Sequence, residues 1–232
     1  FIRIDWRNWR VILIRAFAEL ASTMLFLTAL AQMPLANVSA ILQSLPLTIT
    51  MFAAMFFGEA VGWRRWSAIL VGFIGVLIII RPGSDGFNEY AVLALIAVGF
   101  ITLRDAITRR LERSVPSLFV AFVSAIPVFL FGGAMTVTTG WTPVSWSMCM
   151  IVTVAAISIT CGYLFAVMAM RIGDISFVAP FRYTGMIWAI LFGFLLFKNL
   201  PDQMTILGTC IVIGMGVYAF HRERVRQKAS VT

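Results

Sequence analysis

The feature that most constrains this sequence is a series of long apolar runs separated by short turns. Eight runs are predicted as membrane-spanning helices, which need about 20 apolar residues each. They cover residues 10–31, 35–57, 66–80, 89–104, 116–139, 146–170, 174–197 and 203–220. The turns are short and carry proline, glycine and charge, and short turns place consecutive helices antiparallel. The expected fold class is an all-α membrane protein, a multi-span helical bundle.

Composition supports this expectation. The chain is 61% hydrophobic and 12% charged, whereas soluble domains average about 25% charged residues. A transmembrane β-barrel is excluded because its strands would alternate apolar and polar residues. The net charge of +8 does not indicate nucleic-acid binding, since the basic residues form short clusters between the apolar runs.

The distribution of lysine and arginine predicts the orientation of the bundle. The predicted spans place fourteen of these residues on one side and two on the other, and the cytoplasmic side carries the excess. We therefore expect a multi-pass protein of a bacterial-type inner (plasma) membrane with its C-terminus in the cytoplasm. The fourteen are Arg3, Arg7, Arg10, Arg64, Arg65, Arg104, Arg109, Arg110, Arg113, Arg171, Arg222, Arg224, Arg226 and Lys228; the two are Arg81 and Lys198.

The first three spans and the last three superimpose when the sequence is shifted by 139 residues, which places Gly75 on Gly214. We interpret this as a duplication, with residues 1–84 an incomplete first repeat of three spans. Residues 85–232 are then a second repeat of five spans with a basic cytoplasmic tail. Two further spans are expected before Phe1. Because five is an odd number, the two repeats would be inverted, as in many secondary transporters.

The run "MPLANVSAILQSLPLTITMFAAMFFGEAVGWRRWSAILVGFIGVLIIIRPG" resembles the EamA-type domain of the drug/metabolite transporter superfamily. The match rests on a proline in mid-span, a Gly-Glu pair at the end of that span and two glycines in the next: Pro46, Gly58, Glu59, Gly72 and Gly75. The second half carries a similar pattern in Pro180, Pro201, Gly208 and Gly214. It departs at Phe197 and Lys198, which stand where the Gly-Glu pair would fall.

The resemblance implies ten helices in two inverted five-helix repeats, with both termini in the cytoplasm. It also implies a central cavity that opens to one side of the membrane at a time. The family includes exporters of amino acids and other metabolites as well as uptake carriers, so the resemblance indicates transport without naming the substrate.

Arg182 is a charged residue deep inside a predicted span. It lies about eight residues from the cytoplasmic end, which is roughly 12 Å at 1.5 Å per residue. Its counterpart in the first repeat is Gln43, and carriers of this plan bind substrate near such a midplane position. A guanidinium suits a carboxylate or a phosphate. Three interpretations stay open: contact with substrate, a salt bridge to Glu19, or snorkelling to the interface.

Glu19 is a carboxylate near the middle of its own span. Arg15 lies four residues earlier on the same helical face, a spacing that permits a direct ion pair. Glu19 could carry a proton in proton-linked transport, or it could be a permanently ionised partner of Arg15 or Arg182. We favour the second interpretation.

Two spans carry features of cavity-lining, bendable helices. Polar or helix-breaking residues follow one arc of the span 35–57: Ser39, Gln43, Pro46 and Thr50. Pro46 removes a backbone donor in mid-span, and Pro180 and Gly185 flank Arg182 in the other repeat. We predict Pro46, Pro180 and Gly185 as hinges.

Aromatic residues could form a wall of the same cavity. Tyr163 in the span 146–170 is a further candidate for contact with the substrate, and the wall would consist of Phe181, Tyr183 and Trp188. Ordinary core packing is the alternative for all three residues of the wall.

The sequence has no phosphate-binding Gly-Lys motif, no cluster of metal ligands and no catalytic triad. We therefore expect neither an enzyme nor a cofactor. The predicted function is secondary active transport of small metabolites by alternating access. The expected substrates are amino acids or similar carboxylate-bearing compounds, moved by export, and coupling to protons is an open alternative. A flippase for lipids or lipid phosphates, an uptake carrier and a channel are the alternatives. The expected partners are membrane lipid, a small metabolite and protons, without nucleic acid.

Overall fold

The computed structural model describes residues 5–58, 61–82, 88–112, 114–140, 143–172 and 182–229. Within these ranges the regular structure is helical and contains no strand. The helices are α1 (Trp6–Gln32), α2 (Leu35–Leu42), α3 (Leu45–Phe56), α4 (Trp63–Ile80), α5 (Glu89–Thr108), α6 (Ser117–Thr139), α7 (Trp146–Ile172), α9 (Thr184–Phe197) and α10 (Gln203–Ala229). The prediction of an all-helical fold is confirmed.

The predicted span 35–57 is interrupted. It consists of α2 and α3, which are separated at Gln43 and Ser44. Pro46 explains the break, because proline has no N–H to donate and its ring clashes with the carbonyl four residues earlier, that of Leu42. The interruption agrees with the expectation that Pro46 kinks this span, and α2 and α3 together are long and apolar enough to cross a membrane.

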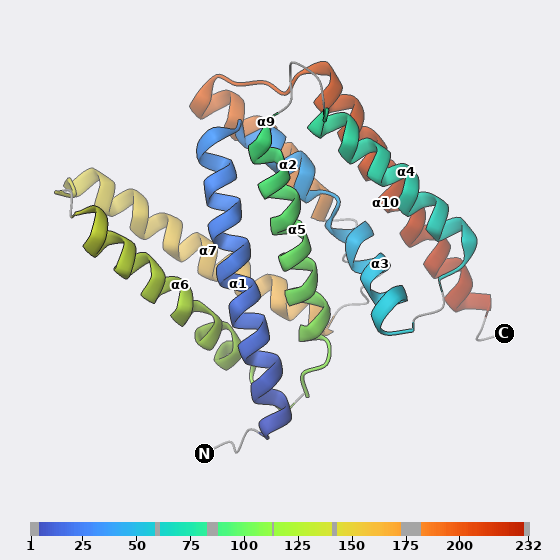
Figure 1. Ribbon diagram of the computed structural model, residues 1–232, viewed down its shortest axis with the longest axis horizontal. Coiled ribbons are helices and arrows are strands. Elements are labelled where there is room, and N and C mark those ends of the chain that lie inside the picture. The colour runs from blue at the N-terminus through green and yellow to red at the C-terminus, as the bar shows by residue number, and fades with distance from the viewer. Residues whose placement is uncertain are drawn as a thin grey trace.

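The bundle is built from antiparallel helices that pack closely in two pairs. α1 packs against α5, and α4 packs against α10 (Figure 1). The two segments α2 and α3 lie between these pairs and contribute to the main core, which includes Ile41, Leu47, Ile69 and Val98. The helix break thus lies inside the bundle rather than at its surface.

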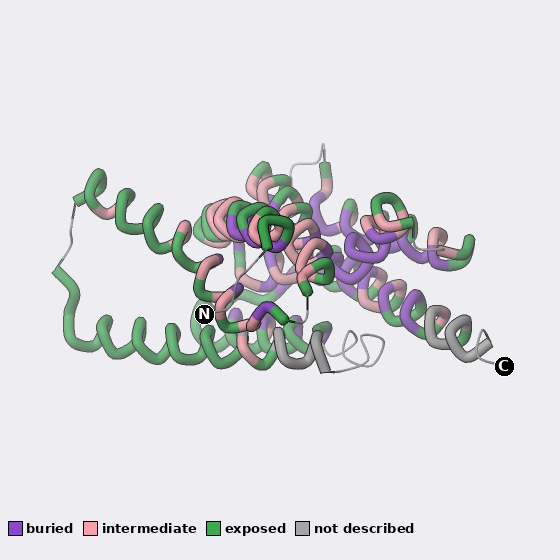
Figure 2. Tube along the Cα trace, turned by 90° about the horizontal axis from the view of Figure 1, so that it is seen from below, coloured by how far each residue is buried: buried purple, intermediate pink, exposed green. Residues whose placement is uncertain are grey.

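α6 and α7 extend away from the rest of the bundle, and both are exposed along most of their length (Figures 1 and 2). In the described residues, six segments are long and apolar enough to cross a membrane: α1, α2 with α3, α4, α5, α6 and α10. The apolar parts of α7 and α9 are shorter. Apolar side chains exposed on such helices suit a lipid environment, so the chain is a multi-pass membrane protein. The inverted repeat stays a prediction.

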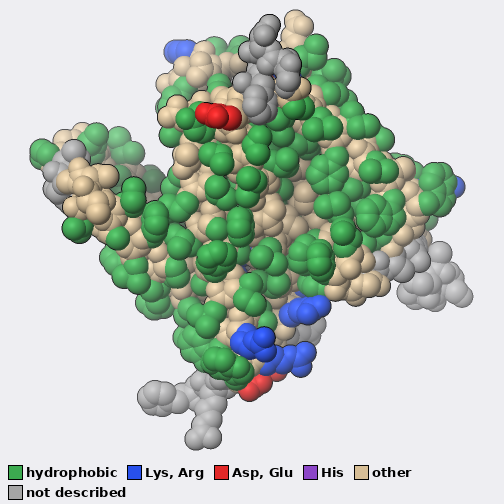
Figure 3. Space-filling model, in the orientation of Figure 1, with side chains coloured by type: hydrophobic (Ala, Val, Ile, Leu, Met, Phe, Trp, Pro, Cys, Tyr) green, Lys and Arg blue, Asp and Glu red, His purple; other side chains and the backbone are tan. Residues whose placement is uncertain are grey.

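Basic side chains gather at the end of the bundle where α1 begins and α5 ends. In the face shown in Figure 3, hydrophobic side chains cover the middle of the molecule and blue side chains lie below it. Arg7, Arg10, Arg109 and Arg110 are exposed at this end. Several predicted boundaries differ from the structure: α1 begins at Trp6 rather than 10, α5 continues beyond 104 to Thr108, and α10 continues beyond 220 to Ala229. Arg104, which was counted among the basic residues of the cytoplasmic side, therefore lies within α5.

Candidate functional site

A pocket of about 210 Å³ lies at the break between α2 and α3. It is lined by Ser39, Leu42, Gln43, Leu45, Pro46, Arg182 and Gly185. The sequence predicted five of these as site or hinge residues: Ser39, Gln43, Pro46, Arg182 and Gly185. The structure brings these five together from two parts of the chain about 140 residues apart.

The break in the helix connects the two sides of the pocket. The Gln43 side chain is buried, and its Nε2 donates a hydrogen bond to the carbonyl O of Tyr183 at 3.1 Å. Tyr183 directly precedes α9, so this bond joins the end of α2 to the start of α9. Beside it, Pro46 leaves the Leu42 carbonyl without its usual helical donor. The pocket therefore lies where two helix ends meet, with backbone polar groups close to it.

Arg182 forms an ion pair with Asp105 of α5, rather than with Glu19 as one interpretation of the sequence had it. Its Nη1 and Nη2 approach Asp105 Oδ2 at 3.5 and 3.4 Å. Both nitrogens meet one oxygen, and the distances exceed the 2.7–2.9 Å or so that is usual for a strong charged hydrogen bond. The Arg182 side chain is 36% exposed. It is therefore loosely held and accessible from the pocket.

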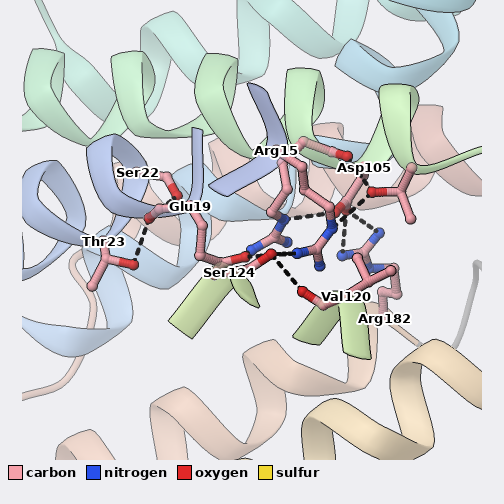
Figure 4. A network of polar contacts seen from close by, with 10 residues as sticks. Arg15, Glu19, Ser22, Thr23, Asp105, Val120, Ser124 and Arg182 are labelled. Carbon is pink, nitrogen blue, oxygen red and sulfur yellow. Dashed lines mark hydrogen bonds and ion pairs between the residues drawn. The ribbon is translucent and has the colours of Figure 1, made fainter. Parts of the chain in front are cut away.

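Asp105 belongs to a chain of ion pairs between helices (Figure 4). Its Oδ1 accepts a hydrogen bond from Arg104 Nε at 2.9 Å, and Arg104 Nη1 lies 3.0 Å from Glu19 Oε1. The predicted pair between Arg15 and Glu19 is confirmed, with Arg15 Nη1 at 3.8 Å from Glu19 Oε2.

Arg15 extends the network towards α6. Its Nε donates to Thr108 Oγ1 at 3.0 Å, and its Nη1 contacts Ser124 Oγ of α6. Together these contacts connect α1, α5, α6 and the residues that precede α9. Buried side chains of opposite charge contact one another in this network, as ionisable side chains inside membranes usually do.

Residues 1–81 and 89–219 match the EamA-like transporter family. The chain belongs to this family. The family and the relatives described next are transporters, which agrees with the expectation that the protein is not an enzyme.

The EamA-like chain is similar to several curated bacterial proteins. It is 25% identical over 192 residues to an S-adenosylmethionine uptake transporter of Rickettsia conorii, covering 82% of this chain and 65% of that protein. A riboflavin transporter of Vibrio cholerae is 28% identical over 91% of this chain and 71% of its own length. A pseudopaline exporter of Pseudomonas aeruginosa is 24% identical over 88% of this chain and 72% of its own. The chain thus spans only 65% of the length of the rickettsial relatives it matches.

A solved crystal structure also resembles the EamA-like chain. It superposes with a TM-score of 0.61 at 19% sequence identity, covering 95% of this chain and 79% of the other. At this identity the likeness concerns the fold alone.

Sequence reasoning missed Arg104 and Asp105. Arg104 was counted only as one of the basic residues of the cytoplasmic side, and Asp105 was not considered. One signal could have found them: Glu19 and Arg182 both lie at depth and need partners of opposite charge. Asp105 lies one helical turn before the end of α5. Arg15 of α1 lies at a similar depth, because it donates a hydrogen bond to Thr108 at that end.

The two aromatic candidates whose side chains are described, Tyr183 and Trp188, lie away from this pocket. The Tyr183 ring is buried, and its hydroxyl lies against Gly216 of α10 rather than in the pocket. Trp188 is 56% exposed and stacks on Phe192 with ring centroids 6.0 Å apart. Neither lines the pocket, and neither does Glu19. Tyr163 belongs to α7, but its side chain lies outside the described part of the chain, as do Pro180 and Phe181.

Proposed function

We propose that the protein is a secondary active transporter of small metabolites that works by alternating access. The observation that carries this proposal is the guanidinium of Arg182, which lines a pocket at a broken helix. Pockets at discontinuous helices are where many secondary transporters bind substrate. Membership of a transporter family and the names of the relatives support the same conclusion.

The proposed substrates are amino acids or similar compounds that carry a carboxylate. Arg182 would bind the anionic group, and Gln43 and Ser39 would supply polar contacts from α2. A guanidinium recognises a planar anion with several donors at once. Export is the proposed direction, and uptake is the alternative because the relatives carry names of both kinds.

The proposed movement is bending at the pocket. Pro46 sits where α2 and α3 are already separate, and Gly185 lies in the first turn of α9 with no atom within 4 Å of the place a Cβ would take. Gly185 can change its backbone angles at little cost in packing, and at Pro46 the missing backbone hydrogen bond weakens the helix. Pro180 is the third proposed hinge. Bending at these positions would alternately open the pocket to each side of the membrane.

The proposed orientation places the end where α1 begins in the cytoplasm, together with the C-terminus. The exposed arginines at that end support it, because cytoplasmic ends of membrane proteins are enriched in basic residues. Reporter domains fused to the C-terminus test it. A reporter active only in the cytoplasm should work, and one that needs the opposite side should not.

The function is tested with the purified protein in liposomes and labelled amino acids. Arg182→Gln should lower the initial rate of transport at least about tenfold, because it removes the charge that binds the substrate. Arg10→Gln is the matched control, since Arg10 is exposed at the end of the bundle. Normal transport by Arg182→Gln would contradict the proposed role of Arg182. Loading the substrate on either side of the liposome distinguishes export from uptake.

Two further arms test the remaining parts of the proposal. A labelled phospholipid in the same liposomes should stay in its leaflet, and its translocation would favour a flippase instead. An imposed pH gradient tests coupling to protons. Glu19 contacts both Arg15 and Arg104, which supports its interpretation as an ion-pair partner. We therefore expect any proton coupling to persist in the folded fraction of Glu19→Gln, although this variant should be less stable than the wild type.

A further inference from the structure

Among the described residues, the ion pairs beside the pocket are arranged so that three guanidinium groups contact two carboxylates. Arg15 and Arg104 both contact Glu19, and Arg104 and Arg182 both contact Asp105. The Asp105 carboxylate therefore contacts two cations, Arg104 on its own helix and Arg182 at the pocket. A third anionic group placed beside Arg182 would give each guanidinium a carboxylate or phosphate of its own.

The two contacts of Asp105 are unequal. Arg104 donates to Oδ1 at 2.9 Å and is also held by Glu19, so it has two short contacts within the bundle. Arg182 meets only Oδ2, at 3.4 and 3.5 Å. The Arg182 side chain is 36% exposed, against 17% for Arg104 and for Asp105. Of the guanidinium groups in this network, Arg182 therefore loses the least interaction when its contact with the carboxylate is broken.

We propose that Asp105 is a positioning residue that competes with the substrate for Arg182. When no substrate is bound, Asp105 holds the guanidinium at the edge of the pocket. A substrate carboxylate or phosphate displaces Oδ2 from Arg182, while Oδ1 stays bound to Arg104. After the substrate leaves, Asp105 recaptures Arg182. This inference rests on the proposed role of Arg182 as the substrate anchor.

The competition has a measurable consequence. Asp105→Asn removes the competing charge, and its amide oxygen can still accept the hydrogen bond from Arg104 Nε. Anions should therefore bind Arg182 more tightly in this variant. A hydrogen bond between charged groups of which one is largely buried contributes more than a fully exposed ion pair, so we expect the half-saturating anion concentration to fall about tenfold. A purely structural role for Asp105 would lower thermal stability without tightening anion binding.

The test uses thermal-shift titration of the purified protein in detergent, at constant ionic strength made up with chloride. Acetate and inorganic phosphate are the two probes, and they distinguish a carboxylate site from a phosphate site. Asp105→Asn should shift the half-saturating concentration of one probe about tenfold downwards. Glu112→Gln, a matched change at an exposed carboxylate, should leave it unchanged. Arg182→Gln should abolish the probe-specific shift.

An unchanged or higher half-saturating concentration in Asp105→Asn would overturn the inference, as would the absence of any probe-specific shift in both the wild type and this variant. Asp105→Glu keeps a competing charge and should stay within about twofold of the wild type. A tenfold fall in Asp105→Glu would overturn the inference even if Asp105→Asn did not fold. If Arg182→Gln loses transport but Asp105→Asn does not bind the anion more tightly, the inference about Asp105 is wrong and the proposed function still holds. If Arg182→Gln transports normally, Arg182 does not bind the substrate, and the proposed function is contradicted as well.

Discussion

Gly75 and Gly208 bring α4 and α10 so close together that neither position has room for a side chain. A Cβ on Gly75 would lie 2.9 Å from the carbonyl O of Gly208, and a Cβ on Gly208 would lie 2.5 Å from the carbonyl O of Gly75. Both obstacles are backbone atoms, which cannot turn aside as a flexible side chain can. Small residues allow this close approach of helices in membranes.

We expect Gly208→Ala to destabilise the protein by about 1–3 kcal/mol, the usual cost of overpacking. The measurement is the midpoint of thermal unfolding in detergent. Gly214→Ala is the control in the same helix, because a Cβ there meets nothing within 4 Å. Alanine favours a helix more than glycine does, so this control should unfold at the same or a higher temperature. Equal midpoints for the two variants would contradict the close crossing.

Thr48 of α3 and Thr102 of α5 form a buried hydroxyl pair with oxygens 2.6 Å apart. The Thr48 hydroxyl also donates to the carbonyl O of Leu45 at 2.9 Å, so Thr102 is the donor within the pair. Thr48→Val should therefore cost about 1–3 kcal/mol, since it leaves a buried donor without this acceptor. The double variant with Thr102→Val should cost less than the sum of the single changes.

Denaturation of the four proteins in this cycle measures the coupling between the two hydroxyls. Thr138→Val, an exposed change on α6, should alter stability by no more than about 0.5 kcal/mol. Strictly additive effects of Thr48→Val and Thr102→Val would show that the two hydroxyls are not coupled.

The sequence was sufficient to predict features that depend on spacing along the chain. Apolar length located the spans, and the separation of four residues predicted the pair of Arg15 and Glu19. The proline at position 46 indicated a weak point, where the structure separates α2 from α3 by two residues, Gln43 and Ser44. Gln43 and Arg182 were expected at similar depth, and both line the pocket.

Features that depend on the rotation or the relative depth of two helices were not predictable in this way. To predict the pair of Arg182 and Asp105, one would need to know which part of α5 lies beside the start of α9. No local sequence pattern contains that information. Trp188 illustrates the problem of rotation. α9 is apolar on all sides, so its sequence does not indicate which face is buried. The exposed position of Trp188 follows from packing alone.

Glu19 should be important for stability because it lies between Arg15 and Arg104. Replacing it with glutamine leaves two largely buried guanidiniums with one carboxylate fewer. Breaking such a pair from one side typically costs about 3–5 kcal/mol, so Glu19→Gln should markedly lower the midpoint of unfolding.

Glu89→Gln provides the matched comparison for Glu19→Gln. Glu89 is exposed in the first turn of α5, where its charge interacts favourably with the helix dipole by about 0.3–1 kcal/mol. Its loss should therefore have a small effect on the midpoint of unfolding. A Glu19→Gln protein that unfolds at the same temperature as Glu89→Gln would show that the network contributes little to stability.

Gly185 offers a direct test of whether the pocket is the transport site. It lines the pocket, and a Cβ there would meet no atom within 4 Å. Gly185→Leu should therefore fold normally while its side chain takes up volume that the substrate needs. We expect the initial rate of transport in liposomes to fall at least about tenfold, with an intermediate effect for Gly185→Ala.

The control for this change is Gly214→Leu, which introduces the same side chain into another helix at a position with equally open surroundings. Both leucine variants should unfold at or above the wild-type temperature, because glycine is the weaker helix former. Only the variant at position 185 should lose transport, since only that position lines the pocket. If the two variants transport at the same rate, the substrate does not pass through the space beside Arg182, and the transport site lies elsewhere in the bundle.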